Sequence, residues 1–307
     1  MRVLFIFLDG IGLGEANPET NPFTRAGMPN LNRLLDGRSL LRDSAPFHGE
    51  HASLLAVDPA VGVSGLPQSA TGQAILLTGK NIPAELGYHY GPKPNPEVAA
   101  FLKEGTLFSD FTKAGKKAAL LNAYPPRYFD GVDSGKRLYS SIPLAVTNAG
   151  IPLFRHDDLF AGRALSADFT GEGWRTMLGY IDAPVMDPYQ AGQKLGALAR
   201  GFDFSLFEYW ASDYAGHKQQ MDVAIRLMES FDGVLGGLVE SWDDDGLILV
   251  TSDHGNMEDV STRRHTDADV PALVIGNKTA RDEFTHNMKA LTDIAPAIRR
   301  TVMNTRR

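Results

Sequence analysis

The segment 251–259, with the sequence TSDHGNMED, places an acid and an imidazole directly after an apolar run. That run, GLILV at 246–250, is typical of a buried strand. Asp253 and His254 then offer one hard oxygen and one borderline nitrogen, a pairing that suits a divalent metal ion. The pair alone is equally compatible with an ordinary turn. A metal site therefore depends on partner ligands elsewhere in the chain.

Three other segments supply side chains of the same chemistry. Asp9 follows the apolar run in FIFLDG, and His265 lies in RRHTDADVP. Asp213 and His217 lie four residues apart in ASDYAGHKQ, just after the apolar run FSLFEYW. Ligands in open α/β sheets collect beyond the carboxyl ends of the strands. Because three apparent strand ends deliver Asp or an Asp/His pair, we expect these residues to meet at one metal site.

Ser69 is the candidate nucleophile. It lies in GLPQSATGQAILLTGKN, where residues 70–78 predict a short apolar helix that ends at Gly79. Ser69 would then lie at a helix N-terminus, where free N–H groups and the helix dipole favour an anion such as phosphate. A plain N-cap serine gives the same pattern, but a nearby metal ion would make its hydroxyl easier to ionise. Thr71 is the rival nucleophile and would lie inside the first helical turn.

The elements that must position these residues alternate between strands and helices. Apolar runs predict strands at 3–8, 118–122, 204–210, 247–251 and 272–275. Helical patterns predict helices at 107–113, 189–200, 222–239 and 290–302. The alternation predicts an α/β fold whose sheet is covered on both faces. Residues 125–188 are rich in Gly, Pro, Asp, Arg and aromatic residues with weak periodicity, which predicts an inserted cap between the core segments 1–124 and 189–307.

Composition narrows the class of protein. The chain has 307 residues, of which 43% are hydrophobic and 22% charged, as in ordinary globular proteins. A net charge of −7 and the lack of a basic stripe argue against a nucleic-acid partner. The absence of cysteine excludes disulfides and a thiol nucleophile. The apolar run at 3–8 is too short for a signal peptide or a membrane span, so we predict a cytoplasmic protein without a membrane partner.

The order and context of these residues resemble the alkaline phosphatase superfamily of metalloenzymes, and most closely its cofactor-independent phosphoglycerate mutase and phosphopentomutase branch. SDHGNMED is similar to the Asp-His-Gly-Asn signature of that branch, and DYAGH to its Asp-x-x-Gly-His. HTDADVPALVIG resembles its His-Thr and Val-Pro strand, and LTDIAPAI its final helix. The resemblance covers roughly 1–124 and 189–307. It implies a three-layer α/β/α core with a small inserted cap.

The resemblance also implies roles for the candidate residues. One divalent ion would be held by Asp213, His217 and His265. A second would be held by Asp9, Asp253 and His254, with Ser69 Oγ as a further ligand. Oxygen and imidazole ligands suit Mn²⁺ or Zn²⁺, and the resemblance favours manganese. Ser69 would carry the phosphoryl group during turnover.

Three functions remain open. The first is a phosphomutase-like enzyme that acts on a small phosphorylated metabolite through a phosphoserine intermediate. The second is a phosphatase or phosphodiesterase of the same superfamily, and the third is a metal-stabilised binding protein without catalysis. The context of Ser69 excludes the sulfatase branch, which needs Cys/Ser-x-Pro-x-Arg. The insert matches neither the phosphoglycerate mutase second domain nor the phosphopentomutase cap, so the substrate is not predicted. The oligomeric state is also not predicted.

Other residues with suitable chemistry match none of these motifs. The remaining histidines are interpreted as surface or core residues: His48, His51, His89, His156 and His286. Asp267 and Asp269 are interpreted as solvated loop acids. Arginine matches phosphate geometry with paired donors, so one or two arginines of the insert are candidates for holding the substrate. These arginines are Arg127, Arg137, Arg155, Arg163 and Arg175.

Overall fold

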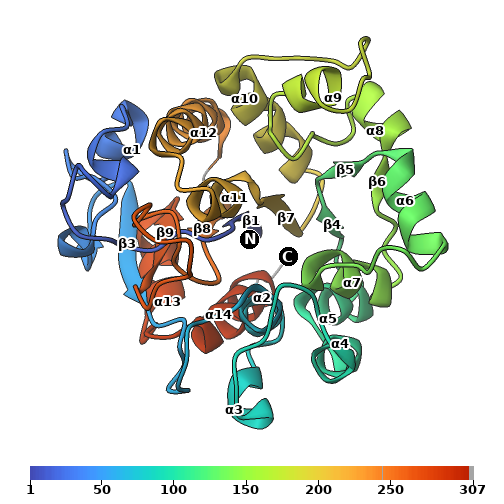
Figure 1. Cartoon of the computed structure of the whole chain (residues 1–307), viewed down its shortest axis with the longest axis horizontal. Helices are drawn as coiled ribbons and strands as arrows, with labels where there is room; N and C mark the ends of the chain where they lie inside the picture. Colours follow the sequence, from blue (N-terminus) through green and yellow to red (C-terminus); the bar gives the residue numbers. More distant parts are fainter. Residues whose placement is uncertain (244, 304–307) are drawn as a thin grey trace.

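The computed structural model describes residues 1–243 and 245–303. Within them, the centre of the molecule is a seven-stranded sheet in the order β2-β3-β9-β8-β1-β7-β4. Its strands are β1 (Arg2–Leu8), β2 (Phe47–His48), β3 (Ala52–Val57), β4 (Ala118–Leu120), β7 (Phe204–Tyr209), β8 (Gly246–Thr251) and β9 (Val270–Ile275). β1 runs parallel to both β7 and β8, whereas β9 runs antiparallel to β8 and to β3. The predicted α/β fold is confirmed (Figure 1).

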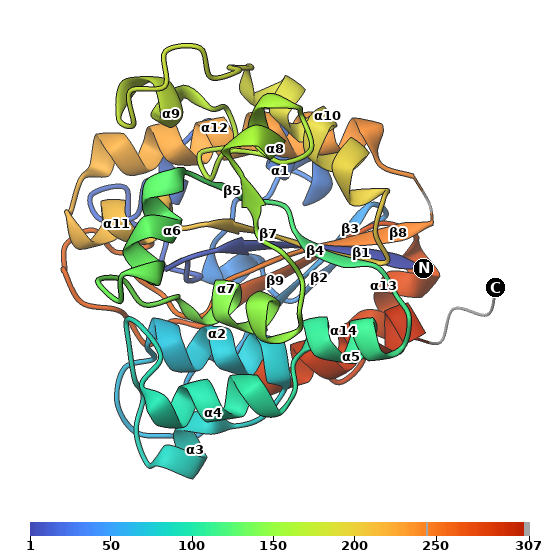
Figure 2. The same ribbon diagram turned by 90° about the vertical axis from the view of Figure 1, so that its right-hand side faces the viewer.

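Helices cover both faces of this sheet (Figure 2). One face is covered by α2 (Ser69–Thr78), α5 (Leu107–Lys113), α7 (Ser141–Asn148) and α14 (Ile294–Met303). The other is covered by α1 (Pro29–Leu34), α10 (Pro188–Ala199) and α12 (Met221–Ser241). Central strand β1 explains the arrangement, because alternate side chains join opposite cores: Val3, Phe5 and Phe7 join one, and Leu4, Ile6 and Leu8 the other. A strand buried on both faces reads as a continuous apolar run.

The remaining helices lie around this core. Outside residues 125–188 they are α3 (Ile82–Leu86), α4 (Pro96–Glu104), α11 (Ala211–His217) and α13 (Lys278–Thr285), with 3-10 turns at Pro22–Thr24, Arg42–Ser44 and Leu291–Asp293. All five predicted strands are present, and the helix predicted at 107–113 has these same bounds. The helix predicted at 290–302 begins as a 3-10 turn before α14. The sequence did not predict β3.

The strand directions bring four loops to one edge of the sheet. β1, β7 and β8 are parallel neighbours, so their carboxyl ends lie side by side. Because β9 runs antiparallel to β8, the loop between them stays at that edge until β9 begins. β3 is antiparallel to β9 and so runs in the same direction as β8. The segment after β3 therefore leads to the start of α2 at the same edge.

The segment 125–188 is joined to both layers. It contains α6 (Pro126–Asp133), α7, β6 (Phe154–Arg155), α8 (His156–Phe160) and α9 (Glu172–Thr176), and β6 pairs with β5 (Ala123–Tyr124). On one face, Ser141 Oγ of α7 donates a hydrogen bond of 3.0 Å to the Ala70 carbonyl of α2. On the other, Leu165 and Phe169 are buried in the core. The segment thus packs on the sheet layers and also surrounds a small apolar cluster of its own around Trp174.

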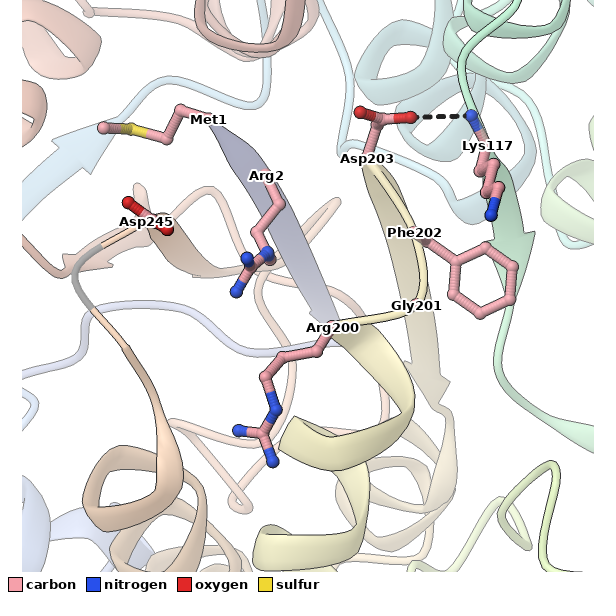
Figure 3. A pocket seen from close by; sticks show the side chains of 8 residues that line it. All are labelled: Met1, Arg2, Lys117, Arg200, Gly201, Phe202, Asp203 and Asp245. Carbon is pink, nitrogen blue, oxygen red and sulfur yellow. Dashed lines mark hydrogen bonds between the residues drawn. The ribbon is translucent and has the colours of Figure 1, made fainter. Parts of the chain in front are cut away.

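The opposite edge of the sheet carries a hollow of about 540 Å³ lined partly by Arg2, Arg200 and Asp203 (Figure 3). Both of its arginines already have partners. Arg2 pairs with Asp243 at 2.6 Å, and Arg200 donates to the Ser241 carbonyl at 2.6 Å. This hollow lies at the amino ends of β1 and β7, away from the loops just described. Among the described residues, the helices are all too short or too polar to cross a membrane.

Candidate metal centre and nucleophile

The first cluster of possible metal ligands joins α11 to the loop before β9. Asp213 and His217 lie four residues apart on α11, so they project from the same face of the helix. Asp213 Oδ2 lies 3.2 Å from His217 Nε2, and Asp213 Oδ1 lies 3.8 Å from His265 Nε2. One ligand atom from each of the three residues falls within 4.8 Å of the others. The cluster can hold a cation.

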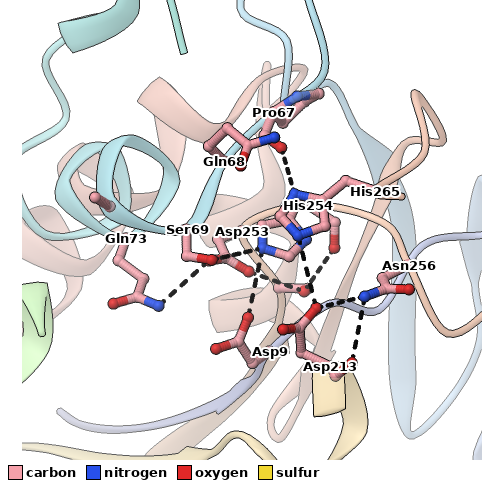
Figure 4. A network of polar contacts seen from close by, with 12 residues as sticks. Asp9, Pro67, Gln68, Ser69, Gln73, Asp213, Asp253, His254, Asn256 and His265 are labelled. Carbon is pink, nitrogen blue, oxygen red and sulfur yellow. Dashed lines mark hydrogen bonds and ion pairs between the residues drawn. The ribbon is translucent and has the colours of Figure 1, made fainter. Parts of the chain in front are cut away.

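A second cluster lies at the ends of β1 and β8. Asp9, Asp213 and His254 place one ligand atom each within 4.8 Å of one another. His254 Nε2 lies 3.5 Å from Asp9 Oδ1 and 3.6 Å from Asp253 Oδ2. Asp213 therefore borders both clusters, a sharing that the sequence did not predict. Figure 4 shows the carboxylates of Asp9 and Asp213 converging on the stacked imidazoles of His254 and His265.

Backbone carbonyls orient two of these imidazoles. His265 Nδ1 lies 2.8 Å from the Pro67 carbonyl, and His217 Nδ1 lies 2.7 Å from the Arg263 carbonyl. A carbonyl can only accept, so each Nδ1 carries the proton and, in the neutral ring, Nε2 presents a lone pair. Those two Nε2 atoms face each other at 3.3 Å. Two facing lone pairs need a proton or a cation between them, which is the arrangement of metal-ligating histidines.

Burial and charge set the pKa values of these groups. Burial raises the pKa of Asp9 well above its ordinary value, and the charges of Asp253 and Asp213 raise it further. Burial, followed by the charge of Asp213, raises the pKa of Asp253 to about 8. Burial lowers the pKa of His254 to about 3, with a smaller effect from His265. Asp9 Oδ1 is also buried without a hydrogen-bond partner among the described residues. The carboxylates thus lack a positive charge, and a divalent cation would supply it.

Asp213 is the exception among the carboxylates. Burial alone would raise the pKa of Asp213, but hydrogen bonds from His217 and Asn256 and the charge of His254 hold it down at about 2. The hydrogen bond to Asp213 in turn raises the pKa of His217. An ionised Asp213 between the two clusters can offer one oxygen to each.

Helix α2 begins at Ser69, one residue before the predicted helix 70–78, and ends before Gly79. Ser69 lies at the helix N-terminus as predicted, but Gln68 is the N-cap. Ser69 Oγ lies 3.1 Å from His254 Nε2, and the Ser69 side chain is buried at the helix N-terminus. All ten residues of α2 are buried, so the helix holds Ser69 firmly against the site. The rival Thr71 instead donates within its own layer, to the carbonyls of Gln68 at 3.1 Å and Tyr90 at 3.2 Å. Thr71 Oγ1 also accepts from the Tyr90 amide at 3.2 Å, so its hydroxyl is engaged by Gln68 and Tyr90.

Four supporting residues were not predicted as part of the site. Asn256 Nδ2 donates to Asp213 Oδ1 at 2.6 Å, and Gln73 Nε2 donates to Asp253 Oδ2 at 3.4 Å. Ser252 Oγ accepts from the Ile11 amide at 2.9 Å, and buried Glu258 accepts from the Gly12 amide at 2.8 Å. Asn256 and Glu258 lie within the SDHGNMED motif, which was the available signal. Gln73 lies one helical turn after Ser69, and no feature of the sequence singles it out.

The insert arginines, which were candidates for holding the substrate, have other partners or are exposed. Of the insert arginines, Arg137 lies over the Tyr128 ring and Arg155 over the Phe129 ring. Arg163 pairs with Asp158, Arg175 bonds the Ala183 carbonyl, and Arg127 is exposed. Nothing in the structure brings these arginines to the Ser69 hydroxyl.

Comparison with known proteins shows similarity to metalloenzymes. A family model described as the metalloenzyme superfamily matches residues 179–304. A 2,3-bisphosphoglycerate-independent phosphoglycerate mutase of Vibrio atlanticus is 28% identical over 221 residues, which are 66% of this chain and 42% of the relative. The chain therefore spans less than half the length of that mutase.

Solved structures share the fold at low identity. A protein of Pyrococcus horikoshii has a TM-score of 0.59 and 15% identity, covering 100% of this chain and 98% of that one. Alkaline phosphatase from the Antarctic bacterium TAB5 has a TM-score of 0.54 and 12% identity, covering 99% of both chains. A phosphoglycerate mutase of Leishmania mexicana has a TM-score of 0.51 and 12% identity, covering 98% of this chain and 95% of that one.

The family match, the relatives and the fold support a metalloenzyme of the alkaline phosphatase superfamily, as the motifs predict. Within that class, its curated relatives are phosphoglycerate mutases at low identity. The particular reaction does not follow from this likeness.

Proposed function

We propose that the chain is a dinuclear-metal phosphoryl-transfer enzyme, phosphomutase-like, that acts on a small phosphorylated metabolite through a phosphoserine at Ser69. The position of Ser69 carries the proposal. Its Oγ lies 3.1 Å from His254 Nε2, at the first residue of a buried helix and beside both clusters of acids and imidazoles. A hydroxyl placed there meets the positive end of a helix dipole and the site of the proposed cations.

In this proposal one ion is held by Asp213, His217 and His265, and the other by Asp9, Asp253, His254 and Ser69. The partnerless Asp9 Oδ1 and the facing imidazole nitrogens fit cations. When bound, two divalent ions would stabilise charge on the attacking and leaving oxygens. Mn²⁺ is favoured by the resemblance to the mutases, and Zn²⁺ suits the same ligands.

The chain's own residues would bind and orient the phosphoryl group. Ser69 Oγ forms a bond to phosphorus as its proton leaves to solvent, while the bond from phosphorus to the substrate oxygen breaks and that oxygen takes up a proton. The N-terminus of α2 then stabilises the negative charge of the phosphoserine. In a mutase, another oxygen of the same substrate would next take the phosphoryl group. Residues 125–188 would position the substrate's other end and limit the access of water.

A hydrolase of the same superfamily is the second candidate, in which water takes the phosphoryl group from Ser69. One observation favours it: the side chain of His217 is 42% exposed, so one side of the centre is open to solvent. A mutase must instead keep water from its phosphoserine while the substrate turns.

A screen of phosphorylated compounds with Mn²⁺ or Zn²⁺ tests the proposal and separates the candidates. The panel should contain sugar phosphates, phosphoglycerates and nucleotides, and each assay should score phosphate release separately from isomer formation. Isomer formation without release indicates a mutase, and release alone indicates a hydrolase. If metal-loaded, folded protein gives neither with any compound nor with p-nitrophenyl phosphate, the proposal fails and a metal-stabilised binding protein becomes the better account.

A further inference from the structure

Glu208 is an acid inside a core strand, next to the proposed reaction centre. It lies on β7 opposite Phe7 of the parallel strand β1. Side chains alternate along a strand, so Glu208 points to the face that Phe7 and Leu206 occupy, which is the face covered by α2. Asp9 lies two residues after Phe7, and its amide bonds the Tyr209 carbonyl at 2.9 Å. Glu208 is thus an acidic neighbour of the site on the side of the nucleophile helix.

The structure holds Glu208 in place with dedicated contacts. The Asn122 side chain forms two hydrogen bonds with the Glu208 backbone. Its Nδ2 donates to the Glu208 carbonyl at 2.8 Å, and its Oδ1 accepts from the Glu208 amide at 2.8 Å. Tyr124 Oη donates to Glu208 Oε1 at 2.6 Å. Both Asn122 and Tyr124 are buried. Burial raises the pKa of Glu208 to about 7, and the hydrogen bond from Tyr124 opposes this effect. The carboxyl group is therefore oriented, and a hydrogen-bond donor or a cation placed beside it would favour its ionised form.

A buried hydroxyl without a partner lies beside it. The ring of Tyr128 lies 4.5 Å from that of Tyr124, and Tyr128 is only 8% exposed. Its Oη has no hydrogen-bond partner among the described residues. The guanidinium of Arg137 lies 4.8 Å from the centre of the Tyr128 ring, so it covers the ring face. Because buried polar groups are almost always paired, this hydroxyl is available to bind a polar group of a ligand.

We propose that Glu208, Tyr124 and Tyr128 form a subsite for the non-reacting end of the substrate, and that this end carries a hydrogen-bond donor, either a hydroxyl or an ammonium group. The inference rests on the proposed function, since it places the subsite beside the transferred phosphoryl group. A carboxylate accepts hydrogen bonds and repels a second carboxylate. Phosphate esters that end in a carboxylate are therefore the wrong substrates for this subsite.

Three esters of equal length test the chemistry of that end: 2-hydroxyethyl phosphate, phosphoethanolamine and phosphoglycolate. We expect Mn²⁺-loaded protein to turn over one or both donor-ended esters with a kcat/KM about tenfold or more above that of phosphoglycolate. Comparison of 2-hydroxyethyl phosphate with phosphoethanolamine distinguishes a hydroxyl donor from an ammonium donor. A preference for phosphoglycolate, or equal rates with all three, overturns the subsite.

Two conservative variants connect the preference to the named residues. Glu208→Gln keeps the shape and removes the charge, and Tyr128→Phe removes only the hydroxyl. Each should reduce the preference for donor-ended esters by about tenfold, expressed relative to p-nitrophenyl phosphate. An exposed Tyr–Glu pair provides matched controls, because Tyr189 bonds Glu240 on the surface. Tyr189→Phe and Glu240→Gln should leave the preference unchanged. If all four variants behave alike, the subsite is wrong.

A binding measurement separates this inference from the proposed function. Dissociation constants for the three esters should be measured by calorimetry on Mn²⁺-loaded Ser69→Ala protein, which lacks the proposed nucleophile. Weaker binding of phosphoglycolate that disappears in the double variant with Glu208→Gln supports the subsite even if wild-type protein shows no turnover, in which case only the proposed function fails. Equal binding of all three esters overturns the subsite, even if p-nitrophenyl phosphate is hydrolysed and the proposed function stands.

Discussion

Ser69 Oγ and His254 Nε2 lie 3.1 Å apart, although 185 positions separate the two residues in the chain. The contact joins the N-terminus of α2 to the loop after β8. It exists because β3 and β8 end at the same edge of the sheet, and a loop after each strand leads to one of these segments. The proposed nucleophile and a proposed metal ligand are thus held by rigid elements on both sides.

The first prediction concerns metal content. Wild-type protein saturated with Mn²⁺ and then freed of excess metal should retain two ions per chain by elemental analysis. Asp253→Ala should retain fewer, because removal of one charged ligand leaves an underfilled site. Asp267→Ala is the matched control, since Asp267 is an exposed acid close to His265 in sequence. A wild-type stoichiometry of zero or one would contradict the dinuclear centre.

The second prediction concerns Asn256, which bonds Asp213 at 2.6 Å without belonging to either cluster of possible ligands. Asn256→Ala should weaken Mn²⁺ affinity by about 10–100-fold, because residues that orient a ligand typically contribute this much. Competition with a chelator gives the affinity. Exposed Asn148, at the end of α7, provides the control variant Asn148→Ala. Equal affinities for the two variants would show that Asn256 does not orient the ligand.

The third prediction concerns the close approach of α2 to the loop after β8. A Cβ atom on Gly72 would lie 2.8 Å from both Cβ and the carbonyl oxygen of Asp253. Gly72→Ala should therefore displace Asp253 and reduce kcat/KM by on the order of a hundredfold, as small misplacements of reacting groups do. Gly27→Ala is the control, because its Cβ would meet its nearest atom at 3.6 Å. Unchanged kinetics in Gly72→Ala would mean that Asp253 needs no fixed position.

The fourth prediction concerns pH and the metal-free protein. The pKa of Asp253 is raised to about 8 in the fold, whereas an aspartate in an unfolded chain has a pKa near about 4. The folded state holds a proton that the unfolded chain has lost, so this group makes the protein less stable as pH rises through that window. His254 acts in the opposite direction, because its pKa is lowered to about 3 in the fold. Below about pH 6.5 the unfolded chain gains a proton on this residue that the folded state does not, so His254 favours unfolding only there.

Between about pH 6.5 and 8 the buried carboxylates act without that opposition. The Tm of metal-free protein should fall across this range, and Mn²⁺ should reverse the trend because a bound cation stabilises the ionised acids. Scanning calorimetry with and without Mn²⁺ checks both. The variant Asp253→Asn has no ionisable group at this position, so the Tm of its metal-free form should fall less steeply over the same pH range. A Tm profile identical to that of the wild type in this variant would assign the pH dependence elsewhere.

The sequence predicted the centre of the fold better than its surroundings. β1 and β8 are apolar on both faces and are followed directly by Asp9 and by Asp253, so both the strands and their functional ends were visible. β3 was missed because Ala52–Val57 is a short apolar run that strand and helix periodicity describe equally well. Yet β3 sets the position of α2, so the contact between Ser69 and His254 could not be derived without it.

The segment 125–188 shows a different limit. Its four helices have only five to eight residues each, so apolar spacing gives little periodic signal. The packing of α7 against α2 depends on a contact between distant segments, Ser141 with Ala70. Likewise, nothing in the sequence pairs Glu208 with Tyr124. Deleting the whole segment would remove core residues, so point variants are the better test of its proposed role in specificity.

The most direct test of the central claim is whether Ser69 itself becomes phosphorylated. Mn²⁺-loaded protein should be mixed with the best substrate from the screen, quenched in acid within one turnover and examined by peptide mass spectrometry. We predict one added phosphoryl group on Ser69, none on Thr71, and a loss of turnover of at least about a thousandfold in Ser69→Ala but not in Thr71→Ala. Rapid turnover by folded, metal-loaded Ser69→Ala, with no phosphopeptide in the wild type, would contradict the account.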